Sequence, residues 1–208
     1  MNSEKRIGIL GGTFNPIHLG HLMIAEQAYQ EYHLDKVWIM PSGISYLKKN
    51  CDILPSSIRA EMVELSIASN PHLELSTIEV QREGNTYTYE TLEQLKREYQ
   101  DTTFFFIIGA DTLFSMEHWK NIDQVFSNCE LLVSVRNDSS LEELTEKAAE
   151  YKVKYNGIIH MLHSPNIEIS SGNIRKMVSN QKSIKYYVTE EVENYIMEHE
   201  LYRKMENV

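Results

Sequence analysis

Cysteine, positive charge and long apolar runs are all scarce in this chain of 208 residues. The two cysteines, Cys51 and Cys129, stand far apart, so we expect no disulfide framework and predict a reducing, cytoplasmic environment. No apolar run approaches the roughly 18 to 20 residues that span a bilayer. The segment Met1–Lys5 is too short and polar for a signal peptide. The sequence therefore predicts neither a membrane protein nor a disulfide-rich secreted one.

The charge balance restricts the classes of partner. The chain has 20 Lys and Arg against 30 Asp and Glu, a formal net charge of −10. Nucleic acids and anionic membranes are bound through clustered Lys and Arg, so we expect neither as a partner. An anionic small substrate must instead be bound by groups at the site itself, such as helix N-termini, histidines and a few cationic side chains. Hydrophobic residues make up 42%, which suits one α/β domain or one with an appended subdomain. The sequence shows no internal repeat, low-complexity tract or linker, so we expect a single domain over residues 1–208.

Short apolar segments alternate with helical patterns along the chain. This alternation predicts an α/β fold in which helices cover both faces of a mostly parallel sheet. The continuous apolar run Phe104–Ile108 is typical of a central strand covered on both faces. Ligands of such sheets bind beyond the carboxyl ends of the strands. The predicted strands are Arg6–Leu10, Val37–Met40, Leu73–Ser76, Phe104–Ile108, Leu131–Val135 and Ile158–Leu162.

A glycine turn and two histidines directly follow the first predicted strand. Gly11 and Gly12 permit a tight turn and a close approach to a ligand. A helix is predicted to begin near Leu19, so its N-terminal N–H groups would face the same loop. His18 and His21 are three residues apart and would project from one helical face toward a bound anion. The run predicts a phosphate site; a purely structural loop or half of a zinc site are the alternatives, although no third ligand follows at metal-like spacing.

Three further segments carry groups suited to a nucleotide. In Ile169–Arg175, hydroxyl and N–H groups at a helix start can bind phosphate, with Arg175 one turn further; an ordinary N-cap is the alternative. After the central strand, Gly109 and Ala110 leave room for a nucleotide, and the Asp111 carboxylate can accept hydrogen bonds from ribose or cap a helix. Trp119 can stack on a flat ring or serve as core.

With these motifs in order and at matching spacing, the chain resembles the bacterial nicotinate-nucleotide adenylyltransferases of the HxGH nucleotidyltransferase superfamily. The resemblance implies a Rossmann-like fold. It also implies transfer of AMP from ATP to nicotinate mononucleotide, which yields deamido-NAD and pyrophosphate, with Mg²⁺ carried on the ATP. It rests on Gly11–His21, Arg59, Arg82–Thr88, Phe105–Asp111, Trp119 and Ile169–Arg175.

The resemblance also implies roles for individual residues. His18, His21 and Arg175 would hold the ATP phosphates as catalytic residues, and no protein ligand to a metal is predicted. Lys48 is expected to reach a phosphate of the mononucleotide, and Thr86 and Trp119 to line the pocket for that substrate. Homo-oligomerisation is left open. The expected ATP contacts are Gly11, Gly12, Thr13, Phe14, Gly109, Asp111, Ile169, Ser170 and Ser171.

The chain departs from the family pattern at four places. Asn15 stands where the family usually has aspartate, and Gly172 stands where it has threonine or serine. Ile44–Lys49 replaces the P-P-H-K segment of the family, and Val135–Asp138 lacks its K-R-P-G turn, so Arg136 is given no role. Two alternatives follow for function. One is an adenylyltransferase that uses nicotinamide mononucleotide or both mononucleotides, because a few pocket atoms decide between amide and carboxylate. The other is a non-catalytic nucleotide sensor.

Overall fold

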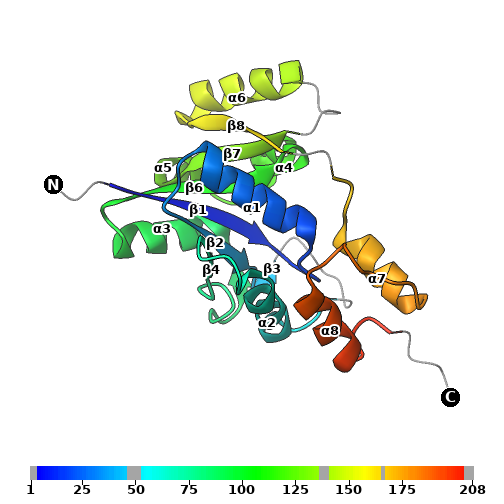
Figure 1. Ribbon diagram of the computed structural model, residues 1–208. Coiled ribbons are helices and arrows are strands. Elements are labelled where there is room, and N and C mark those ends of the chain that lie inside the picture. The colour runs from blue at the N-terminus through cyan, green and yellow to red at the C-terminus, as the bar shows by residue number, and fades with distance from the viewer. Residues whose placement is uncertain (1–3, 46–52, 136–140, 165–166, 204–208) are drawn as a thin grey trace.

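Six parallel strands form the central sheet of the computed structural model, which describes residues 4–45, 53–135, 141–164 and 167–203 (Figure 1). Their spatial order is β4-β2-β1-β6-β7-β8. All six predicted strands are confirmed, with ends shifted by at most two residues. The strands are β1 (Lys5–Gly12), β2 (Lys36–Pro41), β4 (Leu73–Leu75), β6 (Thr102–Gly109), β7 (Glu130–Val135) and β8 (Ile159–His163).

Helices cover both faces of this sheet, because alternate residues of the buried strands belong to two separate apolar clusters, one on each face. In β6, Phe105 and Ile107 pack with α1 (Leu19–Glu31), α2 (Ser56–Ile67), α7 (Ser171–Ser179) and α8 (Glu190–Glu198). Phe104, Phe106 and Ile108 point to the other face. That face carries α3 (Thr88–Glu98), α4 (Ala110–Ser115), the 3-10 turn η1 (Met116–His118), α5 (Ile122–Asn128) and α6 (Leu141–Tyr155). The predicted Rossmann-like α/β class is confirmed; the single domain over 1–208 stays a prediction.

A second, very small sheet lies outside the central one. It pairs β3 (Ile44–Ser45) with β5 (Asn85–Thr86) in parallel. No pattern in the sequence predicts it, since strands of two residues show no periodicity. It joins the segment after β2 to the segment before α3, and so fixes Thr86 relative to the central sheet.

The strand order creates a switch point between β1 and β6. These neighbours are paired in parallel, with Leu10 opposite Ile107. The helix after β1 packs on one face, and α4, which follows β6, packs on the other. The chain therefore diverges at the carboxyl ends of the two central strands, where open α/β sheets bind ligands. In the described part of the chain, no helix has the length and apolar character that a bilayer crossing requires.

Candidate active site

Glycines end both central strands at the switch point. At Gly12 a Cβ atom would come within 2.9 Å of the Phe14 ring, so the absent side chain lets that ring pack against the strand end. Phe14 itself is buried and has a φ of 47°, a left-handed conformation that is rare for a bulky residue. Gly109 is exposed, and a Cβ there would meet no heavy atom within 4 Å. The space above the end of β6 is therefore open to a ligand.

The two predicted histidines come together at the start of α1. His18 is the N-cap residue, and the His18 and His21 rings stack with centroids 3.6 Å apart. The His18 backbone N–H donates to His21 Nδ1 at 3.3 Å. An Nδ1 atom that accepts a hydrogen bond places the proton of neutral His21 on Nε2, where it can be donated to an oxyanion. His21 is half-buried and His18 is 7% exposed.

Two expected donors of α1 are used inside the protein. The Leu19 N–H donates to Tyr187 O at 2.9 Å, so this first helical N–H contributes to tethering the segment before α8. The His21 N–H donates to His18 O at 2.9 Å. The prediction that the helix start presents its N–H groups to an anion therefore does not hold for Leu19 and His21. The positive end of the helix dipole remains at the loop, because it arises from all aligned peptide units.

The second predicted motif packs directly on the loop between β1 and α1. Ser170 caps α7 by accepting from Asn173 N at 3.2 Å. Ser171 Oγ donates to Pro16 O at 2.8 Å, and Arg175 Nη1 donates to Asn15 O at 2.8 Å. A guanidinium carries five N–H donors, so Arg175 can hold this loop and still bind a phosphate. The Ser171 hydroxyl proton, by contrast, is committed to Pro16.

Arg59 fixes the same loop from the other side. It is 2% exposed and donates to Thr13 O at 2.6 Å, to Ser42 O at 2.6 Å and to Leu54 O at 2.9 Å. Burial lowers the pKa of its guanidinium group. Together with Gly43 O, which accepts from Arg59 Nη2 at 3.5 Å, four backbone carbonyls compensate that burial. They come from the segments after β1, after β2 and before α2. Arg59 therefore sets the spacing between these segments.

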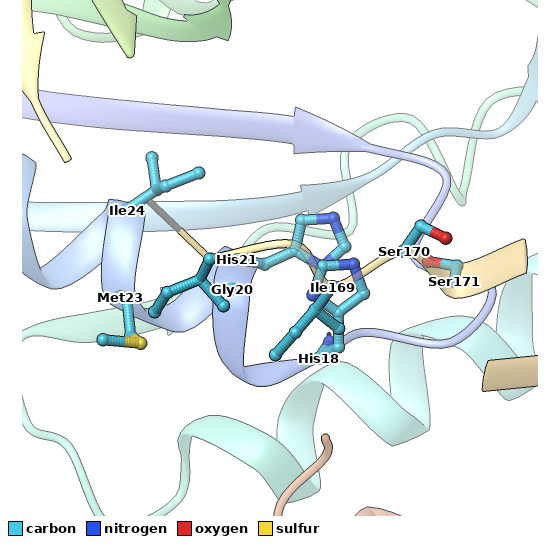
Figure 2. A pocket seen from close by; sticks show the side chains of 9 residues that line it. His18, Gly20, His21, Met23, Ile24, Ile169, Ser170 and Ser171 are labelled. Carbon is cyan, nitrogen blue, oxygen red and sulfur yellow. Dashed lines mark hydrogen bonds between the residues drawn. The ribbon is translucent and has the colours of Figure 1, made fainter. Parts of the chain in front are cut away.

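A cavity of about 270 Å³ lies between α1 and the segment that leads into α7 (Figure 2). Figure 2 shows the two imidazole rings beside Ser170 and Ser171, with Met23 and Ile24 further along the helix. One end of the cavity is thus polar and the other aliphatic, a division that suits a nucleotide with phosphates and a flat base. Its lining residues are His18, Gly20, His21, Met23, Ile24, Ile167, Ile169, Ser170 and Ser171.

A buried carboxyl group organises the region around Thr86. Glu79 is 9% exposed and accepts from Thr91 Oγ1 at 2.9 Å. It also hydrogen-bonds with the Thr86 side chain and the Gly43 backbone. Burial raises the pKa of Glu79, although these contacts and the nearby charge of Arg82 oppose the rise. Glu79 therefore ties both sides of the small sheet to α3, and the Thr86 side chain faces inward toward it.

The comparisons with known proteins agree with this geometry. Residues 9–177 match the family model described as Cytidylyltransferase-like. A protein of Lachnoclostridium phytofermentans named "Probable nicotinate-nucleotide adenylyltransferase" is 39% identical over 198 residues, covering 95% of this chain and 99% of that one. A protein of Moorella thermoacetica with the same name is 40% identical over 199 residues, covering 95% and 92%. The chain belongs to the nicotinate-nucleotide adenylyltransferase family.

A solved structure supports the fold of this family member. The Plasmodium falciparum nicotinic acid mononucleotide adenylyltransferase complexed with NaAD matches with a TM-score of 0.77 at 20% identity, covering 95% of this chain and 97% of that chain. This likeness concerns the fold, whereas the family model and the two relatives above confirm the family that the sequence motifs suggested.

The remaining residues that the family resemblance suggested are placed as follows. Trp119 is half-buried and meets Phe106 edge-on, with ring centroids 6.1 Å apart, and its backbone N–H donates to Met116 O at 2.8 Å. Asp111 is exposed in the first turn of α4, whose N-cap residue is Gly109, so the alternative in which Asp111 caps this helix is wrong. Lys48 lies outside the described residues.

Sequence reasoning missed two residues of this nicotinate-nucleotide adenylyltransferase family member and gave a third no role. Glu79 and Tyr202 had no assigned function, and Arg59 was only part of the resemblance. Each is a buried or half-buried polar group among apolar neighbours, a signal that appears only once burial is known. Within the described ranges, no three or more His, Cys, Asp or Glu side chains are grouped so that they could hold a metal ion.

Proposed function

We propose that this protein transfers AMP from ATP to nicotinate mononucleotide, producing deamido-NAD and pyrophosphate. One observation carries the proposal. Two motifs with phosphate-binding chemistry, far apart in sequence, are joined at the carboxyl edge of the sheet by the contacts of Ser171 with Pro16 and of Arg175 with Asn15. The family membership agrees with this reaction. Because both substrates are phosphorylated metabolites of the cell interior, we propose that the protein acts in the cytoplasm.

ATP would lie across the start of α1. The adenine would occupy the aliphatic end of the cavity near Ile24, Ile167 and Ile169. The phosphates would then reach His18 and His21. The sugar would lie toward the open end of β6, where Asp111 would accept hydrogen bonds from its hydroxyl groups. The backbone around Gly11–Phe14 and Ile169–Ser171 would complete the contact with ATP.

The chemical step needs alignment more than it needs an activated nucleophile. The attacking group is a phosphate oxygen of the mononucleotide, which is already ionised at neutral pH. It must approach the α-phosphorus opposite the departing pyrophosphate, and charge that gathers on the transferring and leaving oxygens must be neutralised. His21 Nε2 would donate to these oxygens, and Arg175 would hold the pyrophosphate from the other side.

A divalent ion would arrive with the nucleotide. Since the described residues offer no cluster of three or more ligands, we infer that the ATP phosphates provide most of the ligands of Mg²⁺. When bound, the ion would neutralise part of the triphosphate charge. His18 and His21 would then bind the oxygens that the ion leaves exposed.

The mononucleotide would bind on the other side of the switch point. Trp119 would supply an aromatic face there, and the backbone at Thr86 would border the same region. Because the Thr86 side chain contacts Glu79, its role would be to shape the wall while backbone groups read the pyridine substituent. Lys48 would contribute a positive charge to the phosphate of this substrate.

A pyrophosphate-release assay with ATP, Mg²⁺ and a panel of mononucleotides tests the proposal. Pyrophosphate should appear with nicotinate mononucleotide, and deamido-NAD should be the product. Equal or faster turnover with nicotinamide mononucleotide would assign the amide-specific or dual-specific activity instead. ATP binding without pyrophosphate release from any mononucleotide would overturn the proposal and favour a nucleotide sensor.

Variants then test the roles of individual residues. His21→Ala and Arg175→Ala should each lower kcat by roughly 10²- to 10³-fold, because each removes donors to the oxygens that gain charge. Lys176→Ala is the matched control, since Lys176 is the exposed neighbour of Arg175 on α7. Near-normal kcat in a folded His21→Ala or Arg175→Ala protein would exclude that residue from catalysis.

A further inference from the structure

The turn after α8 brings Tyr202 back to the loop that follows β1. Leu201 N–H donates to Ile196 O at 3.0 Å, and Tyr202 then adopts a left-handed φ of 62°. The Tyr202 hydroxyl donates to Asn15 Oδ1 at 2.9 Å. Figure 1 shows α8 between α2 and α7, beyond the carboxyl end of β1. The C-terminal turn therefore contacts the loop that carries the first predicted phosphate motif.

Asn15 is the point at which four segments of the chain meet. It is 3% exposed, and its Oδ1 accepts from the Leu54 backbone N–H at 3.4 Å as well as from Tyr202. Its backbone carbonyl accepts from Arg175 Nη1 at 2.8 Å. The position of Asn15 thus depends on the C-terminal turn and on the segment before α2. The position of Arg175, in turn, depends on Asn15.

The surroundings keep the Tyr202 hydroxyl protonated, so that it can donate a hydrogen bond. The guanidinium groups of Arg175 and Arg59 lower the pKa of the phenol, but burial raises the pKa by more. The phenol consequently stays protonated at neutral pH. Asn15 is an uncharged amide, so its contact with Tyr202 leaves the positive charge of both arginines available to the phosphate site.

We propose that Tyr202 is a positioning residue for phosphate transfer: its hydroxyl fixes Asn15, and through Asn15 it fixes Arg175 and the loop between β1 and α1. The inference rests on the proposed function, because it assigns Arg175 to the ATP phosphates. Alignment is the main requirement of this chemistry, and a misplacement of about 1 Å can cost on the order of 100-fold in rate. One hydroxyl that sets the loop can therefore affect turnover without contacting substrate.

The test compares Tyr202→Phe with Tyr186→Phe in the full chain. Both changes remove one phenolic hydroxyl, but Tyr186 is an exposed side chain outside the loop network. For Tyr202→Phe we expect kcat/KM for ATP to fall by roughly 10-fold or more, while KM for the mononucleotide changes by less than about two-fold. The melting temperature should stay well above the assay temperature. Tyr186→Phe should match the unaltered protein in all of these constants.

A second comparison separates positioning from a general loss of stability. If Tyr202 acts through Asn15, then Tyr202→Phe should change kcat/KM by less than about two-fold when it is added to Asn15→Ala. Kinetic constants of Tyr202→Phe that equal those of the unaltered protein, with only a lower melting temperature, would overturn the inference.

Binding of a non-hydrolysable ATP analogue, measured by calorimetry, gives a readout that does not need turnover. Tyr202→Phe should weaken this binding by roughly 10-fold, and Tyr186→Phe should not. If the unaltered protein releases no pyrophosphate with any mononucleotide, the proposed function fails, and analogue binding alone decides the role of Tyr202. If Tyr202→Phe and the unaltered protein then bind the analogue with equal affinity, the inference is wrong.

Discussion

At the scale of single residues, Glu79 shows how burial and hydrogen bonding oppose each other in one carboxyl group. Removal from water favours the neutral acid, while Thr91, Thr86, Arg82 and the Gly43 backbone favour the anion. The effect of burial is larger than the combined effect of these contacts, so the pKa of Glu79 lies above its ordinary value of 4.5. The folded protein therefore binds this proton more tightly than the unfolded chain does.

The raised pKa of Glu79 leads to a prediction about stability and pH. Between its ordinary and raised pKa the folded state holds more protons, so the contribution of Glu79 to stability falls as pH rises through that window. Glu79→Gln removes this titration. The free energy of unfolding of the unaltered protein minus that of Glu79→Gln should thus be larger near pH 4.5 than near pH 7.5, as measured by urea denaturation.

The difference in the free energy of unfolding between the unaltered protein and Glu79→Gln isolates the contribution of Glu79, because both proteins contain all the other carboxyl groups. Glu83→Gln is the control, since it removes a carboxyl group that is exposed in the same segment. A difference for Glu79→Gln that is constant with pH, or that grows as pH rises, would contradict the assignment of burial as the dominant cause.

At the scale of elements, the junction between β6 and α4 lies at Gly109, where the surface is open and the backbone is unstrained. Gly109 has a φ of −80°, which any residue adopts, and a Cβ would meet nothing within 4 Å. Gly109→Ala should consequently change the melting temperature by no more than about 4 °C, since an N-cap Ala costs on the order of 1 kcal/mol or less relative to Gly. If the nucleotide lies over this junction, KM for ATP should rise by roughly 10-fold.

Gly157→Ala is the control, because we expect it to lower stability without changing KM for ATP. A Cβ at Gly157 would lie 2.5 Å from the Phe126 ring, away from the proposed site. That change should lower stability by about 1–3 kcal/mol and leave KM for ATP unaltered. An unchanged KM for ATP in Gly109→Ala would mean that the nucleotide does not pass over the end of β6.

The elements differ in how far the sequence predicts them. The six strands of the central sheet and the two phosphate motifs carry their signals locally, in apolar runs and in residue types with fixed spacing, so both are predictable. The pairing of β3 with β5 carries no such signal. Ser171 was predicted to bind ATP, but its hydroxyl donates to Pro16 O, which lies 155 positions earlier in the chain. A partner at that separation depends on the finished fold.

At the scale of the whole molecule, the site exists only when both ends of the chain are folded together. Arg175 and Tyr202 reach Asn15 across 160 and 187 positions, respectively. Neither α7 nor α8 contributes to the sheet; both are held by apolar packing through residues such as Ile174 and Val192. The chain as a whole carries a formal net charge of −10, so the few cations of the proposed phosphate site must act at short range.

This arrangement predicts a strong linkage between nucleotide binding and global stability. A non-hydrolysable ATP analogue with Mg²⁺ at about 100 times its Kd should stabilise the folded protein by about 2.7 kcal/mol, since only the folded chain contains the site. For a protein of this size that corresponds to a rise in melting temperature of roughly 5–11 °C, measurable by differential scanning fluorimetry. Arg175→Ala should lose most of this rise at the same analogue concentration, whereas Lys176→Ala should keep it. A full rise in Arg175→Ala would show that the C-terminal half of the site does not contribute to holding the nucleotide.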